Sequence, residues 1–149
     1  MIFVRVRPPH CSELHSCKGL VAHYWGRDAA ERCHDQFVEC FKGGKYAPDF
    51  FVAASDDGKD SFLGFAAVHR TMQCTHNIIW LAVNPDLRGK AIGRHLLGAC
   101  LQKADDQDCT LVEVISQERA FYQKHGFFQV RHLGSEWYLM LKPLGEFGL

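Results

Sequence analysis

Apolar and polar residues change their spacing several times along this chain, and each change predicts a new element. The N-terminal stretch "IFVRVR" alternates apolar and charged residues, as a half-buried strand does, and Pro8-Pro9 end it. Helical spacing then predicts a helix from about Ser12 to Trp25. A second helix is predicted from Asp28, as N-cap, to about Phe41, with Gly43-Gly44 as its stop.

From Asp49 onward the pattern predicts mainly short strands. The runs "FFVAAS" and "FLGFAAVHR" flank the turn-rich "DDGKDS" and form a predicted hairpin, and "HNIIWLAV" is a third strand that Pro85 ends. An amphipathic helix follows, with apolar residues at helical spacing. These residues are Ile92, Leu96, Leu97, Cys100, Leu101 and Ala104.

The C-terminal part continues with the strand "TLVEVIS", the short helix "ERAFYQKHG" closed by Gly126, and the strand pair "FFQVRHL" and "EWYLMLK". The predicted order is β-α-α-β-β-β-α-β-α-β-β, and the crossover helix joins two strands that we expect to be parallel. This order predicts an α/β or α+β sheet covered by helices. We expect a single domain over residues 1–149.

Composition and charge exclude several classes of protein. Hydrophobic residues make up 47% and charged residues 23%, as in ordinary globular proteins. Lys+Arg and Asp+Glu are both 17, so the chain lacks the net positive charge that nucleic-acid and anionic-membrane binding usually require. No apolar run approaches the roughly 20 residues of a membrane helix. The N-terminus, with Arg5 and Arg7, does not resemble a signal peptide, so we expect a cytoplasmic protein.

The seven cysteines predict neither disulfides nor a zinc site. Their number is odd, and no Cys-x-x-Cys pair occurs, so reduced thiols are the simpler interpretation. The densest group of metal-ligand types is "HCSELHSC", with His10, Cys11, His15 and Cys17, but its spacing matches no usual zinc pattern. We expect no metal. A metal or redox protein built on the cysteines is the least favoured alternative.

The stretch "LAVNPDLRGKAIGRHLL" runs from an apolar strand through a Gly- and Arg-containing loop into a helix. A helix N-terminus presents unpaired amides, and small residues such as Gly89, Ala91 and Gly93 let a diphosphate approach them. Cationic side chains in the same turn suit a phosphate ester. The alternative is that the glycines only ease a tight turn. The chain has no P-loop string, and no G-x-G-x-x-G follows its first strand.

This stretch resembles the acetyl-CoA loop of the GCN5-related N-acetyltransferase (GNAT) family. The family pattern is a strand ending in Val, a Pro turn, and Arg/Gln-x-x-Gly-x-Gly/Ala opening a long helix. Ala91 departs from it, because the family usually has a glycine there. The later "ERAFYQKHGFF" resembles a second family element, with Phe121, Tyr122, Gly126 and Phe127 in register. The resemblance covers residues 79–128.

The resemblance implies a mixed, mostly antiparallel central sheet of six to seven strands, with helices on both faces and a splayed central strand pair. It also implies that acetyl-CoA is the co-substrate. Backbone groups of Leu81 and Val83 would bind the pantetheine arm, and amides of residues 88–93 would bind the pyrophosphate. The predicted coenzyme-binding residues are Leu81, Val83, Arg88, Gly89, Lys90, Ala91, Ile92, Gly93, Arg94 and Ser116.

The implied reaction is direct attack of an amine on the thioester. Alkylamines have a pKa of about 10.4, so a proton must first leave. By resemblance, Tyr122 is the general acid for the departing thiolate; the alternative is a packing aromatic. Many relatives have a Glu or His as base at the position of Asn77. The side-chain amide of Asn77 cannot accept a proton at neutral pH. Asn77 could hold a water that relays protons to His76 or Glu113.

The sequence therefore predicts an acetyl-CoA-dependent N-acetyltransferase that acts on a small amine or on a peptide amino group. Acids of the two early helices could attract a cationic acceptor, or simply solvate a helix face. They are Glu13, Asp28, Glu31, Asp35 and Glu39. The runner-up is a non-catalytic acyl-CoA-binding or regulatory domain, which Asn77 favours. We expect no nucleic-acid or membrane partner, and whether the protein is a homodimer stays open.

Overall fold

The computed structural model describes residues 3–72 and 74–145. Strands and helices follow one another in the predicted order. The strands are β1 (Val4–Arg7), β2 (Asp49–Ser55), β3 (Phe62–Met72), β4 (Thr75–Val83), β5 (Leu111–Ser116), β6 (Phe128–Gly134) and β7 (Trp137–Pro143). The helices are α1 (Leu14–Trp25), α2 (Arg27–Lys42), α3 (Ile92–Asp106) and α4 (Arg119–Lys124), with short 3₁₀ turns η1 (Cys11–Glu13) and η2 (Pro85–Leu87).

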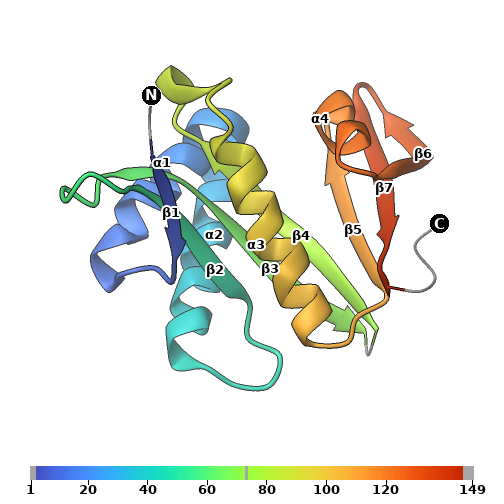
Figure 1. The fold of residues 1–149 in the computed structure, drawn as a ribbon, viewed down its shortest axis with the longest axis horizontal. Coiled ribbons are helices and arrows are strands. Elements are labelled where there is room, and N and C mark those ends of the chain that lie inside the picture. Colours follow the sequence, from blue (N-terminus) through green and yellow to red (C-terminus); the bar gives the residue numbers. More distant parts are fainter. Residues whose placement is uncertain (1–2, 73, 146–149) are drawn as a thin grey trace.

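The strands form one mixed sheet of seven strands in the order β1-β2-β3-β4-β5-β7-β6 (Figure 1). Every neighbouring pair is antiparallel except β4 and β5, which the crossover helix α3 joins as a parallel pair. A helical crossover is the usual way to bring two parallel strands side by side. The predicted sheet, its strand number and its one parallel pair are therefore confirmed.

Each face of the sheet has its own hydrophobic core. On one face α3 packs through its fully buried residues Ile92, Leu96 and Leu97, together with Tyr122 of α4. On the other face α1 and α2 contribute buried small residues such as Cys17 and Cys33. The helices thus cover both faces, as expected (Figure 1). None of the helices in the described part of the chain is long and apolar enough to cross a membrane.

The start of α2 differs from the prediction. Gly26, with φ 93°, is the N-cap, and its carbonyl accepts the first helical hydrogen bond from the amide of Ala30 at 3.1 Å. Asp28 was predicted as the cap, but it lies inside the first turn. Glycine is the N-cap because α1 ends at the same residue, and the sharp turn between the two helices needs a positive φ. The predicted stop at Gly43 is confirmed.

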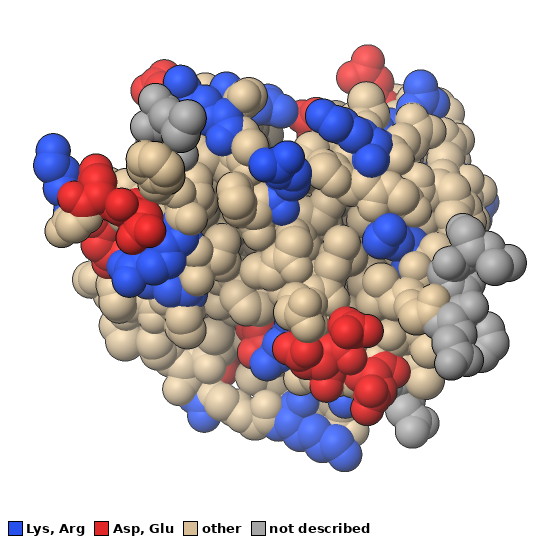
Figure 2. All heavy atoms as spheres, viewed as in Figure 1, with Lys and Arg blue, Asp and Glu red and all other residues tan. Residues whose placement is uncertain are grey.

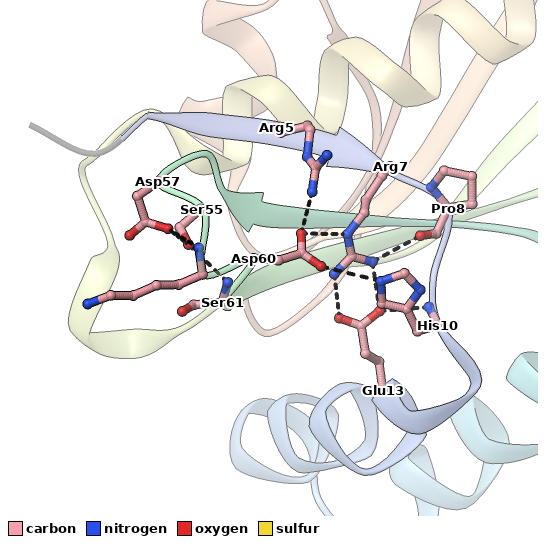
Figure 3. A network of polar contacts seen from close by, with 10 residues as sticks. Arg5, Arg7, Pro8, His10, Glu13, Ser55, Asp57, Asp60 and Ser61 are labelled. Atoms are coloured by element: carbon pink, nitrogen blue, oxygen red, sulfur yellow. Dashed lines mark hydrogen bonds and ion pairs between the residues drawn. The ribbon is translucent and has the colours of Figure 1, made fainter.

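The two arginines of β1 belong to a polar network that fastens this edge strand (Figure 3). Arg7 donates to both carboxylate oxygens of Glu13, at 2.8 and 2.9 Å, and to Asp60 of the β2–β3 turn at 3.0 Å. Arg5 also donates to Asp60. The hydrogen bonds from these arginines hold the pKa of Asp60 well below its usual range. The network ties β1 and η1 to the β2–β3 turn.

The buried His76 of β4 should make the stability of the fold depend on pH. Its ring is 1% exposed, Nε2 donates to Gln107 Oε1 at 2.7 Å, and Nδ1 has no partner within the described residues. Burial lowers the pKa of His76. The unfolded chain takes up this proton near pH 6.5, whereas the folded protein resists it, so the free energy of unfolding should fall as the pH drops below about 6.5.

Denaturant titrations at several pH values between about 5 and 8 test this expectation. His76→Gln should flatten the loss of stability on the acid side, because the buried ring that resists protonation is gone. His15→Gln is the matched control, because His15 lies exposed on α1. Equal slopes for the native protein and His76→Gln would contradict the assignment.

Candidate functional site

The two central strands part at one end, which confirms the predicted splay. β4 and β5 pair from Thr75 with Leu111 to Ile78 with Val114, and no further pair follows. β4 continues to Val83 beside β3, while β5 turns away (Figure 1). A gap therefore opens in the middle of the sheet beyond Ile78.

Backbone groups of β4 point into this gap. Val83 pairs with Gly64 of β3, and the amide of the next residue, Asn84, donates to the carbonyl of Leu63 at 2.9 Å. This pattern defines a non-hydrogen-bonded pair, in which Val83 turns its own N–H and C=O away from β3. By strand alternation Leu81 does the same. The sheet thus directs main-chain donors and acceptors toward β5 where β5 is no longer adjacent.

A cavity of about 360 Å³ occupies the gap. Residues from both faces of the sheet line it: Tyr24 and Trp25 from α1, and Gly93 and Phe121 from the α3 side. Because α1 and α3 cover opposite faces, the cavity passes through the sheet between the parted strands. Such a passage can admit one ligand from each side.

The loop before α3 closes the cavity on one side with free amides. Gly89 has φ 82° and Ala91, the N-cap of α3, has φ 65°. Alternating left-handed residues turn successive N–H groups toward a common concavity that suits an anion. The amides of residues 89–94 donate to no carbonyl of the described residues. Ala91 is in the left-handed region that favours glycine, which explains why the family usually has glycine at this position.

Cationic side chains flank this opening. Figure 2 shows Lys and Arg side chains along the upper edge of the molecule, over the start of α3 and over α4. Arg88, Arg94 and Lys124 line the cavity. Arg88 Nη2 lies 3.0 Å from Glu118 Oε1, an ion pair that joins the loop after β4 to the start of α4. Glu118 is the one carboxylate among the lining residues of this cavity.

Tyr122 of α4 reaches the cavity from the buried side. The residue is 3% exposed, and burial raises the pKa of its phenol well above the usual range. Its hydroxyl has no hydrogen-bond partner recorded in the described part of the chain. A phenol in this state keeps its proton at neutral pH and has no protein acceptor to which it donates. It can therefore donate to a ligand.

The structure separates the other predicted catalytic residues from the cavity. Asn77 and Glu113 lie opposite each other in the paired part of β4 and β5, and neither lines the cavity. Four residues of strand place Asn77 about 13 Å from Leu81. His76 is buried beside Gln107 at the other end of α3.

Most of the predicted coenzyme-binding residues come together. All of them except Lys90 line the cavity. The sequence reasoning missed several lining residues that come from other elements. These are Tyr24, Trp25, Glu118, Lys124 and His125. The sequence did contain a signal for Glu118, Lys124 and His125. They belong to the short helix "ERAFYQKHG", which follows β5, and this position places both ends of α4 next to the gap. Nothing in the sequence pointed to the α1 pair.

Tyr24 is the missed residue with the clearest role in the geometry. Its Oη donates to the carbonyl of Val83 at 2.7 Å, across 59 positions of sequence. That carbonyl points into the gap and has lost its strand partner, so the hydroxyl satisfies it. The guanidinium of Arg88 lies 5.9 Å from the Tyr24 ring. Tyr24 thereby fixes the end of β4 and borders the cavity at once.

A parted parallel strand pair, a cradle of free amides and a buried phenol together form a site that can hold a phosphate group and donate a hydrogen bond to the same ligand. A family model described as "Acetyltransferase (GNAT) domain" matches residues 47–129, more than half of the chain. The chain belongs to the GNAT family. It is accordingly an acetyl-CoA-dependent N-acetyltransferase, which moves an acetyl group to an amine.

Individual GNAT proteins and structures show the same kinship. The chain is 28% identical over 125 residues to a protein of Mycobacterium tuberculosis named amino-acid acetyltransferase, covering 84% of this chain and 68% of that protein. The crystal structure of M. tuberculosis Rv2747 in complex with CoA and NLQ has a TM-score of 0.75 at 21% identity, covering 94% and 99% of the two chains. Thermoplasma acidophilum PaiA N-acetyltransferase in complex with coenzyme A has a TM-score of 0.75 at 14% identity, covering 96% and 100%.

The candidate metal ligands singled out in the sequence do not form a cluster in the described part of the chain. The described residues contain no group of three or more His, Cys, Asp or Glu side chains that could hold a metal ion. His10 of the cluster singled out in the sequence contacts Asp60 instead, and Cys17 is buried among the helices. The lining of the cavity offers cationic side chains and the phenols of Tyr24 and Tyr122.

Proposed function

We propose that the cavity between β4 and β5 binds acetyl-CoA and presents its thioester to Tyr122. The loop amides of residues 88–93 receive the diphosphate, and the backbone of Leu81 and Val83 receives the pantetheine arm. The observation that carries this proposal is the set of free amides in one continuous cavity with the Tyr122 hydroxyl. A diphosphate accepts hydrogen bonds from such amides at a helix N-terminus.

Each residue has a distinct task in this proposal. Tyr122 gives a proton to the sulfur as the acetyl group leaves, and its raised pKa keeps that proton in place beforehand. The Val83 amide points into the gap and stabilises negative charge on the carbonyl oxygen. Tyr24 holds the adjoining peptide through the Val83 carbonyl. Bound acetyl-CoA supplies the thioester and its acetyl group.

The acceptor amine enters from the face that α1 covers, where Tyr24 and Trp25 line the cavity. We propose the amino group of an amino acid or of a short peptide as the acceptor, since a relative at 28% identity is named amino-acid acetyltransferase. Asn77 and Glu113 stay predictions as parts of a proton relay. Neither lies at the cavity, so water must connect them to the amine.

Two measurements test this function in sequence. First, acetyl-CoA should raise the melting temperature, because it binds the folded chain only. Second, a thiol reagent should detect CoA release with amines from a panel that includes amino acids, peptides with free N-termini and alkyl diamines. Turnover on at least one amine is the expected result. Stabilisation by acetyl-CoA without turnover on any amine would instead favour an acyl-CoA-binding regulatory domain.

We also propose a cytoplasmic location. All seven cysteines are free thiols, and four of them are buried. Reducing compartments keep thiols in this state, whereas extracellular proteins of this size often form disulfides. Fractionation of the source cells with an antibody against the chain would test this location.

A further inference from the structure

Four basic side chains lie around the end of α4. Arg94 lies in the first turn of α3, and Lys124 and His125 lie at the end of α4; all three line the cavity. Lys142 of β7 does not line the cavity, but its Nζ lies beside Gly126, the residue after His125, because a Cβ on Gly126 would collide with it. Burial lowers the pKa of His125, and the charges of Lys124, Arg94 and Lys142 lower it further. The cluster therefore spans three elements that meet at this end.

The part of the chain that the structure describes places no carboxylate against this cluster. Within residues 3–72 and 74–145, no ion pair or hydrogen bond is recorded for the side chains of Arg94, Lys124 or Lys142. The one carboxylate that lines the cavity, Glu118, is paired with Arg88. Like charges held together repel one another, and an anionic ligand relieves that repulsion. The arrangement therefore points to an anion that the described residues do not supply.

The position of the cluster limits which anion it can bind. The free amides of the loop already provide a place for a diphosphate, and the thioester lies toward Tyr122 in the proposed binding mode. Two members of the cationic cluster, Lys124 and His125, line the cavity from the end of α4 and not from the loop. Besides its diphosphate, coenzyme A carries a phosphate monoester on the ribose, which has a charge of about −1.5 to −2 at neutral pH. No other part of that molecule is an anion.

We infer that Arg94, Lys124, His125 and Lys142 form a separate subsite for the 3′-phosphate of acetyl-CoA. This inference depends on the proposed binding of acetyl-CoA in the cavity. The subsite makes the protein select CoA over 3′-dephospho-CoA. An acceptor carboxylate is the competing occupant, and the same experiment distinguishes it because dephospho-CoA lacks only the monoester.

Calorimetric titration of CoA and of 3′-dephospho-CoA tests the subsite. The native protein should bind CoA about tenfold or more tightly than dephospho-CoA, the size expected from charge-assisted hydrogen bonds. The double variant Lys124→Gln/Lys142→Gln should lose most of this preference while its affinity for dephospho-CoA changes less than about twofold. The matched control is Lys42→Gln/Lys45→Gln, which removes the same charge from exposed residues near the end of α2.

Each result that contradicts the expected binding would have a different meaning. Equal affinity of the native protein for the two coenzymes would overturn the subsite. So would an equal loss for both coenzymes in the double variant, because the lysines would then act on the diphosphate or on the fold. A preserved preference with a raised KM for an amino-acid acceptor would assign the cluster to the acceptor. Binding of neither coenzyme by the native protein would instead reject the proposed function itself.

Discussion

Tyr122→Phe is expected to lower kcat by about 100-fold or more while it changes the KM for acetyl-CoA by less than about threefold, because general acid catalysis typically contributes at least that much. The substitution removes one oxygen and keeps the ring, so the buried contacts of Tyr122 with Phe121 and Phe127 remain. Its hydroxyl contributes nothing to the fold through hydrogen bonds in the described part of the chain. Steady-state kinetics with the best amine of the panel measure the effect.

The control for this variant is Tyr138→Phe, a partly buried tyrosine of β7 that does not line the cavity. Tyr138→Phe should keep the native kcat. Unchanged kcat in Tyr122→Phe would return Tyr122 to the alternative left open by the sequence, a packing aromatic. A large rise in KM with the native kcat would assign the hydroxyl to coenzyme binding instead.

The sequence predicted the fold well because its signals were local. Alternation in "HNIIWLAV", the apolar face of the helix that begins at Ile92, and the stop at Gly126 each lie within one element. The GNAT resemblance then supplied the parted strands, which the register of β4 and β5 confirms. The cap of α2 was wrong because the decisive constraint, a reversal shared with the end of α1, involves two helices.

The candidate site was only partly predictable for the same reason. The coenzyme loop is contiguous in sequence, and most of its predicted residues line the cavity. Tyr24 and Trp25 reach the site from α1, far away in sequence. A bulge at Ile79 adds a further obstacle, because Trp80 pairs with Ala67 and Ile78 with the next residue, Val68. Beyond the bulge the two faces of β4 exchange, which simple alternation does not predict.

Gly93→Asp is expected to weaken acetyl-CoA binding by about 10- to 100-fold, because a carboxylate would stand at the proposed position of the diphosphate and would repel it. A Cβ on Gly93 would lie 3.4 Å from Cε1 of Phe121 and 3.8 Å from Cδ2 of Leu81. The added carboxylate would therefore enter the cavity between the two parted strands. Affinity measured by calorimetry should fall, whereas kcat at saturating acetyl-CoA should fall much less.

Two matched variants separate charge from shape and from helix stability. Gly93→Ala adds the same Cβ without charge, and its nearest neighbour, Cε1 of Phe121 at 3.4 Å, is at ordinary contact distance, so its affinity should remain within a few-fold of native. Gly98→Asp introduces the same carboxylate one and a half turns later on α3, where a Cβ meets nothing within 4 Å. It should bind acetyl-CoA as the native protein does. If Gly93→Asp also bound normally, the loop amides would not be the diphosphate site, since a carboxylate cannot share that space with a second anion at no cost.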